Sequence, residues 1–174
     1  MPGTALLIVD MQCGVVAAQP AAVRLEQVLD SLQLAIAKAR QRGFPVIFVQ
    51  HEEAGLERSS AAWQLHPALP ATAADHFIGK RHGDSFCDTE LAGLLQSLEV
   101  SRLWLGGCAT DFCVDSTLRN AVSRGFQVTV IRDGHTTLPA FALSGEQVID
   151  HFNAVWQATK ATPQPLRVQA ATAL

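Results

Sequence analysis

The stretch Ala-Leu-Leu-Ile-Val-Asp at residues 5–10 is an unbroken apolar run that ends on an acidic side chain. Such a run is typical of a β-strand that is buried on both faces, as the strands of a parallel sheet are. The stretch Pro-Val-Ile-Phe-Val-Gln at residues 45–50 has the same character and predicts a second buried strand. Shorter runs predict three further strands, at residues 76–79, 102–105 and 127–131.

Helical periodicity occupies the segments between these strands. Within residues 21–42, apolar side chains recur at helical spacing, at Leu25, Leu29, Leu32 and Ile36. Three more helices are predicted, at residues 89–98, 111–124 and 144–159. Strands that alternate with helices indicate βαβ units. We therefore expect an α/β fold, a three-layer, doubly wound sandwich with a mostly parallel sheet between helices on both faces.

The connecting segments carry their own predictions. Gly106-Gly107 is expected to end the fourth strand, and Asp133 to end the fifth. Residues 52–75 are rich in Ala, Ser and Pro and predict a long excursion, with a short helix near Trp63. The tail from Pro163 either adds an edge strand or stays loose.

The composition indicates a folded domain and excludes several classes of protein. Of the 174 residues, 48% are hydrophobic and 17% charged, which argues against disorder and predicts a single domain over residues 1–174. A net charge of −3 without a basic block argues against nucleic acid or an anionic membrane as partner. No apolar run has the length of a signal-peptide core or a membrane span, so we expect a cytoplasmic protein.

Side chains that can do chemistry follow each predicted strand: Asp10, His51, Lys80, Cys108 with Cys113, and Asp133. Because ligands of such sheets bind beyond the carboxyl ends of the strands, an acid, a base and a thiol are expected at one edge. The four cysteines form no C-x-x-C pair, so each is either a small buried side chain or a reactive thiol; they are Cys13, Cys87, Cys108 and Cys113.

Three of these side chains suit nucleophilic catalysis. Cys113 lies at the start of a predicted helix, where the helix dipole favours a thiolate, and a nearby Lys80 would lower the thiol pKa further. Asp10 could take the thiol proton and later pass it to a leaving amine. Each residue also has an ordinary structural interpretation, as a buried thiol, a solvated strand end and a turn residue respectively. Sequence spacing alone does not show that the three side chains touch.

Three segments resemble the signatures of the isochorismatase-like cysteine hydrolases. They are L-L-I-V-D-M-Q at residues 6–12, G-K-R-H-G-D-S-F-C-D-T-E-L at residues 79–91, and L-G-G-C-A-T-D-F-C-V-D-S-T-L-R-N-A-V-S-R-G at residues 105–125. They occur in the family's order, and the resemblance covers about residues 5–157. It implies a six-stranded parallel sheet, with Cys113 as nucleophile and Asp10 as acid and base. Lys80 would be the partner that lowers the thiol pKa.

The resemblance also implies a reaction. A cis peptide bond is expected at Cys108–Ala109, so that the backbone N–H groups of Ala109 and Cys113 form an oxyanion hole. Cys113 would attack a carboxamide or carbamate and form a thioester, which water then hydrolyses. The branch that cleaves isochorismate lacks this cysteine, so an amidase-like branch acting on non-peptide C–N bonds is expected.

Substrate contacts are expected from Gln12, His51, Trp63, Phe112 and Leu138. The alternative for each is plain packing or, for Gln12, a hydrogen bond that stabilises a turn. Related nicotinamidases carry an Asp-x-His metal site after the second strand, where this chain reads Gln-His-Glu-Glu at residues 50–53. Although His51 and His66 are possible ligands, we expect no metal, no cofactor and a substrate other than nicotinamide.

Two alternatives and an assembly state stay open at this point. Cys113 and Arg119 have the Cys-x5-Arg spacing of phosphatases, but the intervening residues lack glycine and include Asp115, which would repel phosphate. A non-catalytic ligand-binding protein of the same fold is the stronger alternative, because fold alone does not determine function. A nucleotide-binding redox protein is disfavoured, since no G-x-G-x-x-G follows the first strand. We expect a dimer or a tetramer that acts on a small molecule.

Overall fold

The computed structural model describes residues 3–139, 142–160 and 162–174. Its elements follow the chain in the order β1 (Gly3–Val9), α1 (Cys13–Val16), α2 (Leu25–Gln41), β2 (Val46–His51), β3 (His76–Lys80), α3 (Leu91–Ser97), β4 (Val100–Cys108), the π-helical turn η1 (Thr110–Val114), α4 (Asp115–Ser123), β5 (Gln127–Thr136), α5 (Gly145–Ala158), β6 (Leu166–Gln169) and the short helix η2 (Ala171–Ala173).

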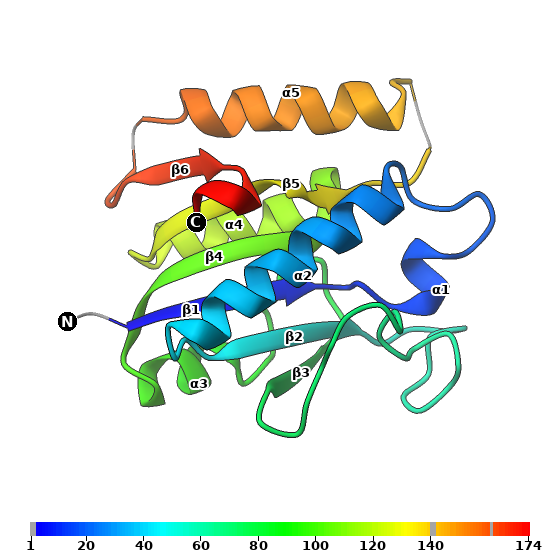
Figure 1. Ribbon diagram of the computed structural model, residues 1–174, viewed down its shortest axis with the longest axis horizontal. Coiled ribbons are helices and arrows are strands. Elements are labelled where there is room, and N and C mark those ends of the chain that lie inside the picture. The colour runs from blue at the N-terminus through cyan, green and yellow to red at the C-terminus, as the bar shows by residue number, and fades with distance from the viewer. Residues whose placement is uncertain (1–2, 140–141, 161) are drawn as a thin grey trace.

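All six strands belong to one parallel sheet in the order β3-β2-β1-β4-β5-β6 (Figure 1). The predicted α/β architecture is thereby confirmed. The tail supplies the sixth strand, which pairs with β5 from Leu166 to Gln169. The strand order reverses between β1 and β4, and such a switch point is where doubly wound folds bind ligands. Asp10 follows β1 and Cys113 lies shortly after β4, so both residues are at this point.

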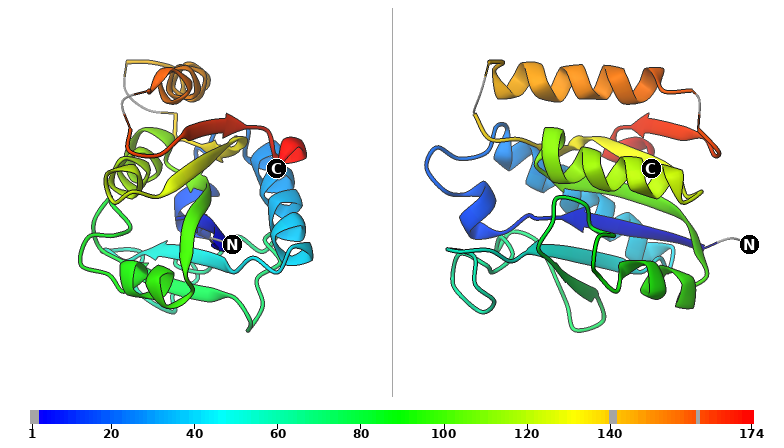
Figure 2. Two further views of the ribbon diagram at one scale, coloured as in Figure 1. Left: turned by 90° about the vertical axis from the view of Figure 1, so that its left-hand side faces the viewer. Right: turned by 180° about the vertical axis from the view of Figure 1, so that it is seen from behind.

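Helices cover both faces of the sheet, as Figure 2 shows from two sides. On one face α2 packs against Leu6 and Ile8 of β1, and on the other α3, α4 and α5 share a core with Leu7 and Val9. Alternate side chains of a strand point to opposite faces, so one apolar run supplies both cores. The apolar run that predicted the first strand is completely buried from Ala5 to Val9.

Helix α2 begins later than its sequence periodicity predicts. The prediction starts at residue 21, whereas the helix starts at Leu25. Arg24 adopts left-handed backbone angles, with φ of 55°, which a helix cannot continue. The far end agrees with the prediction, because Gly43 has φ of +67° just past the helix, as a C-terminal glycine does.

Gly106 and Gly107 do not end strand β4, contrary to the prediction. The strand runs through both glycines to Cys108. Glycine occupies both positions because the neighbouring backbone leaves no room for a side chain. A Cβ atom on Gly107 would lie 2.1 Å from the Val9 carbonyl oxygen, and one on Gly106 would lie 2.5 Å from the Gly134 carbonyl oxygen. These glycines therefore permit the close approach of β1, β4 and β5.

The prediction that β5 ends at Asp133 is also wrong, whereas the long excursion over residues 52–75 is confirmed, since β2 ends at His51 and β3 begins at His76. Strand β5 does not stop at Asp133 but continues to Thr136 after a register shift against β4, and Asp133 Oδ1 accepts a hydrogen bond of 2.8 Å from the Ala171 amide. Residues 52–75, all described by the structure, contain turns and a single bridge from Leu65 to Gln12, but no helix near Trp63. None of the helices in the described residues is both long and apolar enough to cross a membrane.

Candidate active site

The structure brings Asp10, Lys80 and Cys113 together beyond the carboxyl ends of three strands. Lys80 ends β3, Asp10 follows β1, and Cys113 lies in the η1 turn after β4. Lys80 Nζ lies 2.6 Å from Asp10 Oδ2 and donates a hydrogen bond of 3.3 Å to Cys113 Sγ. One ammonium group therefore joins the carboxylate to the thiol.

Lys80 is a buried cation held by several acceptors. Its side chain has no exposed surface. Besides Asp10 and Cys113, Nζ donates a 3.0 Å hydrogen bond to the His82 carbonyl and lies 3.1 Å from His51 Nδ1. A buried ammonium is costly unless it is paired and hydrogen-bonded, and these contacts meet that requirement. An ammonium donates through three N–H groups, so these four neighbours share three hydrogens.

Asp10 has the environment of a proton acceptor. Its side chain is 3% exposed, and Oδ1 is buried with no hydrogen-bond partner among the described residues. Burial raises the pKa of this carboxyl above its usual value, although Lys80 acts in the opposite direction. A carboxylate with a raised pKa holds a proton more readily than an ordinary one, so it is a better general base.

The Cys113 thiol is protonated at rest, which corrects the expectation of a lowered pKa. Burial and the neighbouring Asp10 carboxylate raise the pKa of Cys113 to about 12, and Lys80 only partly opposes them. A single cation is shared by two potential anions, and the carboxylate ionises more readily than the thiol. The resting site therefore pairs a carboxylate with the ammonium and leaves the sulfur neutral.

The backbone around Cys113 forms a π-helical turn rather than the start of an α-helix. Cys113 is the fourth residue of η1, and α4 begins only at Asp115. The carbonyl of Ala109 accepts hydrogen bonds from the amides of Phe112 and Val114, at 3.1 and 3.0 Å. The peptide bond between Cys108 and Ala109 is cis. The assignment of the Ala109 and Cys113 amides to an oxyanion hole stays a prediction.

A buried histidine supports this turn and was missed by sequence reasoning. His135 Nδ1 lies 2.8 Å from Thr110 Oγ1 in η1, and Nε2 lies 3.1 Å from Asn153 Oδ1 in α5. Burial lowers the pKa of His135 to about 4, so the ring is neutral at physiological pH. His135 comes two residues after Asp133, where the strand was expected to have ended. If the sequence had predicted that β5 continues past Asp133, His135 would have been expected at the edge of the site.

Gln12 is engaged by the backbone. Its amide nitrogen donates to the carbonyls of His51 and Trp63, both at 3.0 Å, and its amide oxygen accepts from the His51 amide at 2.7 Å. Gln12 is also completely buried. These contacts match the alternative interpretation, a structural hydrogen bond that ties residues 51–63 to the end of β1.

The other predicted contact residues lie in different places. Of these, His51 contacts the buried trio through Lys80. Trp63 lines a cavity of about 310 Å³ with His66 and Phe77, and no residue of the trio lines this cavity. The buried indole nitrogen of Trp63 has no hydrogen-bond partner among the described residues. Phe112 is 51% and Leu138 39% exposed, so both lie open to solvent. Their assignment as pocket walls stays a prediction.

The site has no visible set of metal ligands around His51. In the described part of the chain, neither His51 nor His66 belongs to a group of three possible metal-ligating side chains. His51 Nδ1 is engaged by Lys80, and His66 Nδ1 accepts from the Ala68 amide at 3.3 Å. The expectation of chemistry without a metal remains a prediction.

The phosphatase alternative does not fit the geometry. Arg119 lies on the exposed side of α4, where its Nε donates to Asp115 Oδ2 at 2.8 Å. A phosphate-binding loop would need the arginine and the cysteine to face one anion across glycine-rich backbone. Cys113 instead contacts Lys80 and lies in a π-helical turn.

Comparison with known proteins identifies the family. The sequence profile of the isochorismatase domain matches residues 4–160. A streptothricin hydrolase of Streptomyces noursei is 32% identical over 136 residues, which are 76% of this chain and 49% of that protein. A ureidoacrylate amidohydrolase, RutB of Serratia proteamaculans, is 29% identical over 180 residues, covering 80% of this chain and 72% of that protein. The chain spans about half the length of the streptothricin hydrolases that it matches.

Solved structures agree with the sequence matches. The crystal structure of an isochorismatase family protein superimposes with a TM-score of 0.89 at 36% identity, covering 96% of this chain and 98% of that one. N-carbamoylsarcosine amidase of Thermoplasma acidophilum shares the fold, with a TM-score of 0.78 at 19% identity over 97% of this chain and 96% of that one. The chain therefore belongs to the isochorismatase-like cysteine hydrolase family that its three sequence motifs predicted.

Proposed function

We propose that this protein is a hydrolase that cleaves a non-peptide C–N bond of a small carboxamide or carbamate, with Cys113 as nucleophile. The observation that carries the proposal is the buried trio, in which Lys80 Nζ lies 2.6 Å from Asp10 Oδ2 and 3.3 Å from Cys113 Sγ. Relatives named as a streptothricin hydrolase and a ureidoacrylate amidohydrolase support a hydrolytic reaction at a C–N bond.

In the first step of the proposed mechanism, the thiol loses its proton as it attacks. Cys113 Sγ forms a bond to the substrate carbonyl carbon while its proton passes to the Asp10 carboxylate. The raised pKa of Asp10 favours this transfer, since the carboxyl holds the proton that the sulfur gives up. Lys80 stays positioned between the two groups and stabilises whichever one is negative. The amides of Ala109 and Cys113 would receive the developing oxyanion.

In the second step, Asp10 acts as the acid. It returns the proton to the departing nitrogen, the C–N bond breaks, and ammonia or an amine leaves behind a thioester on Cys113. Water then attacks the thioester while Asp10 takes a proton from it. The acid is released, and the thiol regains its proton from Asp10. Each cycle consumes one water molecule and returns the site to its starting protonation.

A cavity beside Lys80 is consistent with a small polar substrate. Its volume is about 340 Å³, and of the buried trio only Lys80 lines it, beside charged side chains on the loops after β2 and β3 that include Glu52, Arg58, His82 and Asp88. This volume lies at the lower end of the range of small-molecule sites, and charged groups of both signs surround it.

The proposal is tested by an ammonia-release screen over small carboxamides and carbamates. We expect wild-type protein to release ammonia from at least one compound and Cys113→Ala to release none. Treatment with a chelator should leave the wild-type rate unchanged. Turnover that survives in Cys113→Ala would refute the nucleophile assignment. A chelator-sensitive rate that zinc restores in the wild type and equally in Cys87→Ser would refute chemistry without a metal at the buried trio.

A further inference from the structure

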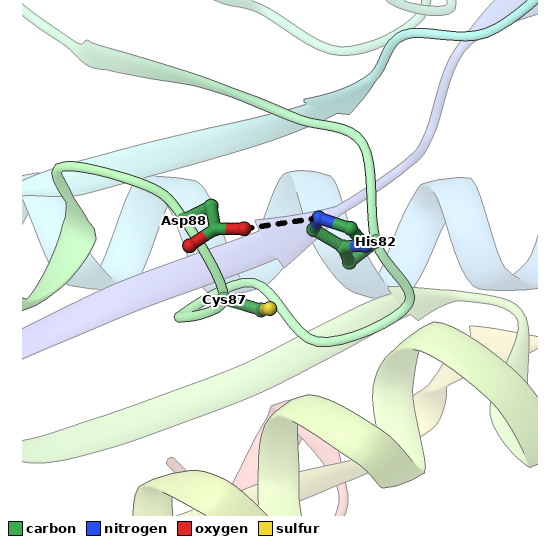
Figure 3. Close-up of side chains that lie close together, drawn as sticks. All are labelled: His82, Cys87 and Asp88. Carbon is green, nitrogen blue, oxygen red and sulfur yellow. Dashed lines mark ion pairs between the residues drawn. The ribbon is translucent and has the colours of Figure 1, made fainter.

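A second group of chemically capable side chains lies on the loop between β3 and α3, and the proposed mechanism does not use it. His82, Cys87 and Asp88 each direct one possible metal-ligating atom toward the others, and these atoms all lie within 4.8 Å of one another (Figure 3). Among the residues that the structure describes, this is the only group of three such side chains with that spacing. None of the three belongs to the Asp10, Lys80 and Cys113 trio.

The spacing of the group fits a tetrahedral ion. His82 Nε2 lies 3.2 Å from Asp88 Oδ2. Two ligands at the usual zinc distances of about 2.1 Å, separated by a tetrahedral angle, would lie ~3.4 Å apart. A thiolate at about 2.3 Å from the same ion would lie ~3.6 Å from each of the others. The nitrogen–oxygen edge is therefore almost formed, and the Cys87 sulfur, which lies within 4.8 Å of both atoms, would approach to ~3.6 Å when an ion binds.

The donor types select the class of cation. A thiolate and an imidazole are ligands of zinc and similar soft divalent ions, whereas calcium and magnesium prefer oxygen ligands alone. We propose that His82, Cys87 and Asp88 bind a zinc ion, or a divalent ion of similar chemistry, through one sulfur, one nitrogen and one oxygen atom. Three protein ligands leave one coordination position for water or a small anion.

The loop backbone is held in place without the ion. Ser85 is buried, and its amide and hydroxyl both contact Thr117 Oγ1 on α4, at 3.0 and 2.8 Å. Asn120 of α4 also donates a hydrogen bond to Asp84. Because the centre of the loop is fixed to α4, less backbone entropy is lost when the side chains close on a cation.

A local turn places two adjacent ligands on the same side. Neighbouring residues of an extended strand point to opposite faces, so Cys87 and Asp88 could not both reach one ion in a strand. Asp88 instead has φ of 51°, in the left-handed region, and Figure 3 shows both side chains beside the His82 ring. His82 and Asp88 are exposed and Cys87 is half-buried, so an ion can enter from solvent.

Binding would displace one proton from the thiol, because the thiolate is the ligating form. The reaction is Cys87–SH plus a divalent cation, giving the cation–thiolate bond and one released proton. No electron is transferred, so neither an oxidant nor a reductant takes part.

The direct test is a cobalt(II) titration of full-length protein stripped of metal and kept reduced with a phosphine. Cobalt replaces zinc in such sites and shows a thiolate-to-metal absorption band when sulfur is bound. We expect one cobalt per chain with this band, and displacement of the cobalt by one equivalent of zinc. Cys87→Ser should abolish the band, and His82→Gln or Asp88→Asn should weaken binding about tenfold or more.

Two cysteine variants serve as matched controls. Cys13→Ser removes a half-buried thiol elsewhere in the chain, and Cys113→Ser removes the proposed nucleophile. Both should bind cobalt as the wild type does. Retention of the band in Cys87→Ser with its loss in Cys113→Ser would assign the metal to the buried trio and overturn the proposal. The absence of any saturable binding by the wild type would overturn it as well, and thermal unfolding checks that each variant is folded.

Discussion

The Asp10 carboxylate adds to burial in raising the pKa of the Cys113 thiol, because its negative charge opposes that of a thiolate. The pKa of the thiol is raised to about 12 by burial and by Asp10, while Lys80 lowers it. Replacing Asp10 by Asn removes the opposing charge and leaves the ammonium beside the sulfur. We therefore predict that Asp10→Asn lowers the thiol pKa and accelerates alkylation by iodoacetamide, although hydrolysis is lost. Each unit by which the pKa of the Cys113 thiol falls gives about tenfold more thiolate at neutral pH.

This prediction is checked by intact-protein mass spectrometry during alkylation near neutral pH. The wild-type Cys113 should react more slowly than a free thiol, and Asp10→Asn at least about tenfold faster than the wild type. Lys80→Met should react more slowly still than the wild type. If Asp10→Asn reacts more slowly than the wild type, Asp10 does not act on the thiol through its charge.

Lys80 also contributes to stability because it neutralises a buried carboxylate. Lys80→Met leaves Asp10 buried without its cation, and the loss of one partner of such a pair costs about 3–5 kcal/mol of unfolding free energy. The double variant Asp10→Asn/Lys80→Met removes both charges and should recover a large part of this loss. Urea denaturation of the two variants measures the difference. Equal stability of the single and the double variant would show that the pair is not electrostatically coupled.

At the scale of elements, His135 connects the η1 turn to α5 through Thr110 and Asn153. Its pKa is lowered from 6.5 to about 4, so the folded protein binds this proton less readily than the unfolded chain. Stability is therefore complete above pH 6.5 and falls as the pH drops toward 4. Between about pH 7 and about pH 5 we predict a loss of ~2 kcal/mol from this group.

The matched variant His135→Gln cannot titrate in this range. Its unfolding free energy, measured with urea at both pH values, should lack this part of the pH dependence, although its stability near neutral pH is lower than that of the wild type. If the wild type and His135→Gln lose the same unfolding free energy between the two pH values, a group other than His135 causes the pH dependence.

The close approach of β1 and β4 gives a second prediction at this scale. Gly107 has φ of +130°, and a Cβ atom there would lie 2.1 Å from the Val9 carbonyl oxygen. Gly107→Ala should therefore destabilise the protein by about 3 kcal/mol or more, since backbone strain and a clash add together. Gly43 also has a positive φ, of +67°, but nothing lies near its Cβ position. Gly43→Ala should cost only about 1–2 kcal/mol.

Thermal and urea unfolding of the two glycine variants give the comparison directly. An equal loss of unfolding free energy in the two variants would mean that the positive φ alone determines the destabilisation. Movement of β1 would then relieve the crowding at Gly107.

At the scale of the whole molecule, local sequence patterns predicted the strands because they depend on short-range apolar runs. The run at residues 5–9 identified a strand buried on both faces, and the alternation of strands with helices identified the parallel sheet. Local patterns did not predict that β4 continues through Gly106-Gly107, because the cause is the backbone of β1 and β5 lying alongside. The same limit concealed the extension of β5 to His135.

The candidate site shows the same division between local and distant causes. The residue types at the strand ends pointed to Asp10, Lys80 and Cys113, since the carboxyl ends of parallel strands share one edge. The thiol pKa was not predictable, because it depends on how completely the fold buries Cys113 and on the charge of Asp10. The hydrogen bonds of Gln12 were not predictable for a similar reason, as their partners His51 and Trp63 lie far along the chain.

In the proposed mechanism, Cys113 forms a thioester with the substrate, and Asp10 acts as acid and base. Intact mass and peptide mapping can detect this thioester on wild-type protein that is quenched with acid during turnover of a carboxamide found by the ammonia-release screen. We predict an added acyl group on the Cys113 peptide, and no such adduct in Cys113→Ala. Ammonia release without any adduct even in a rapid quench, or an adduct on a different residue, would contradict the account.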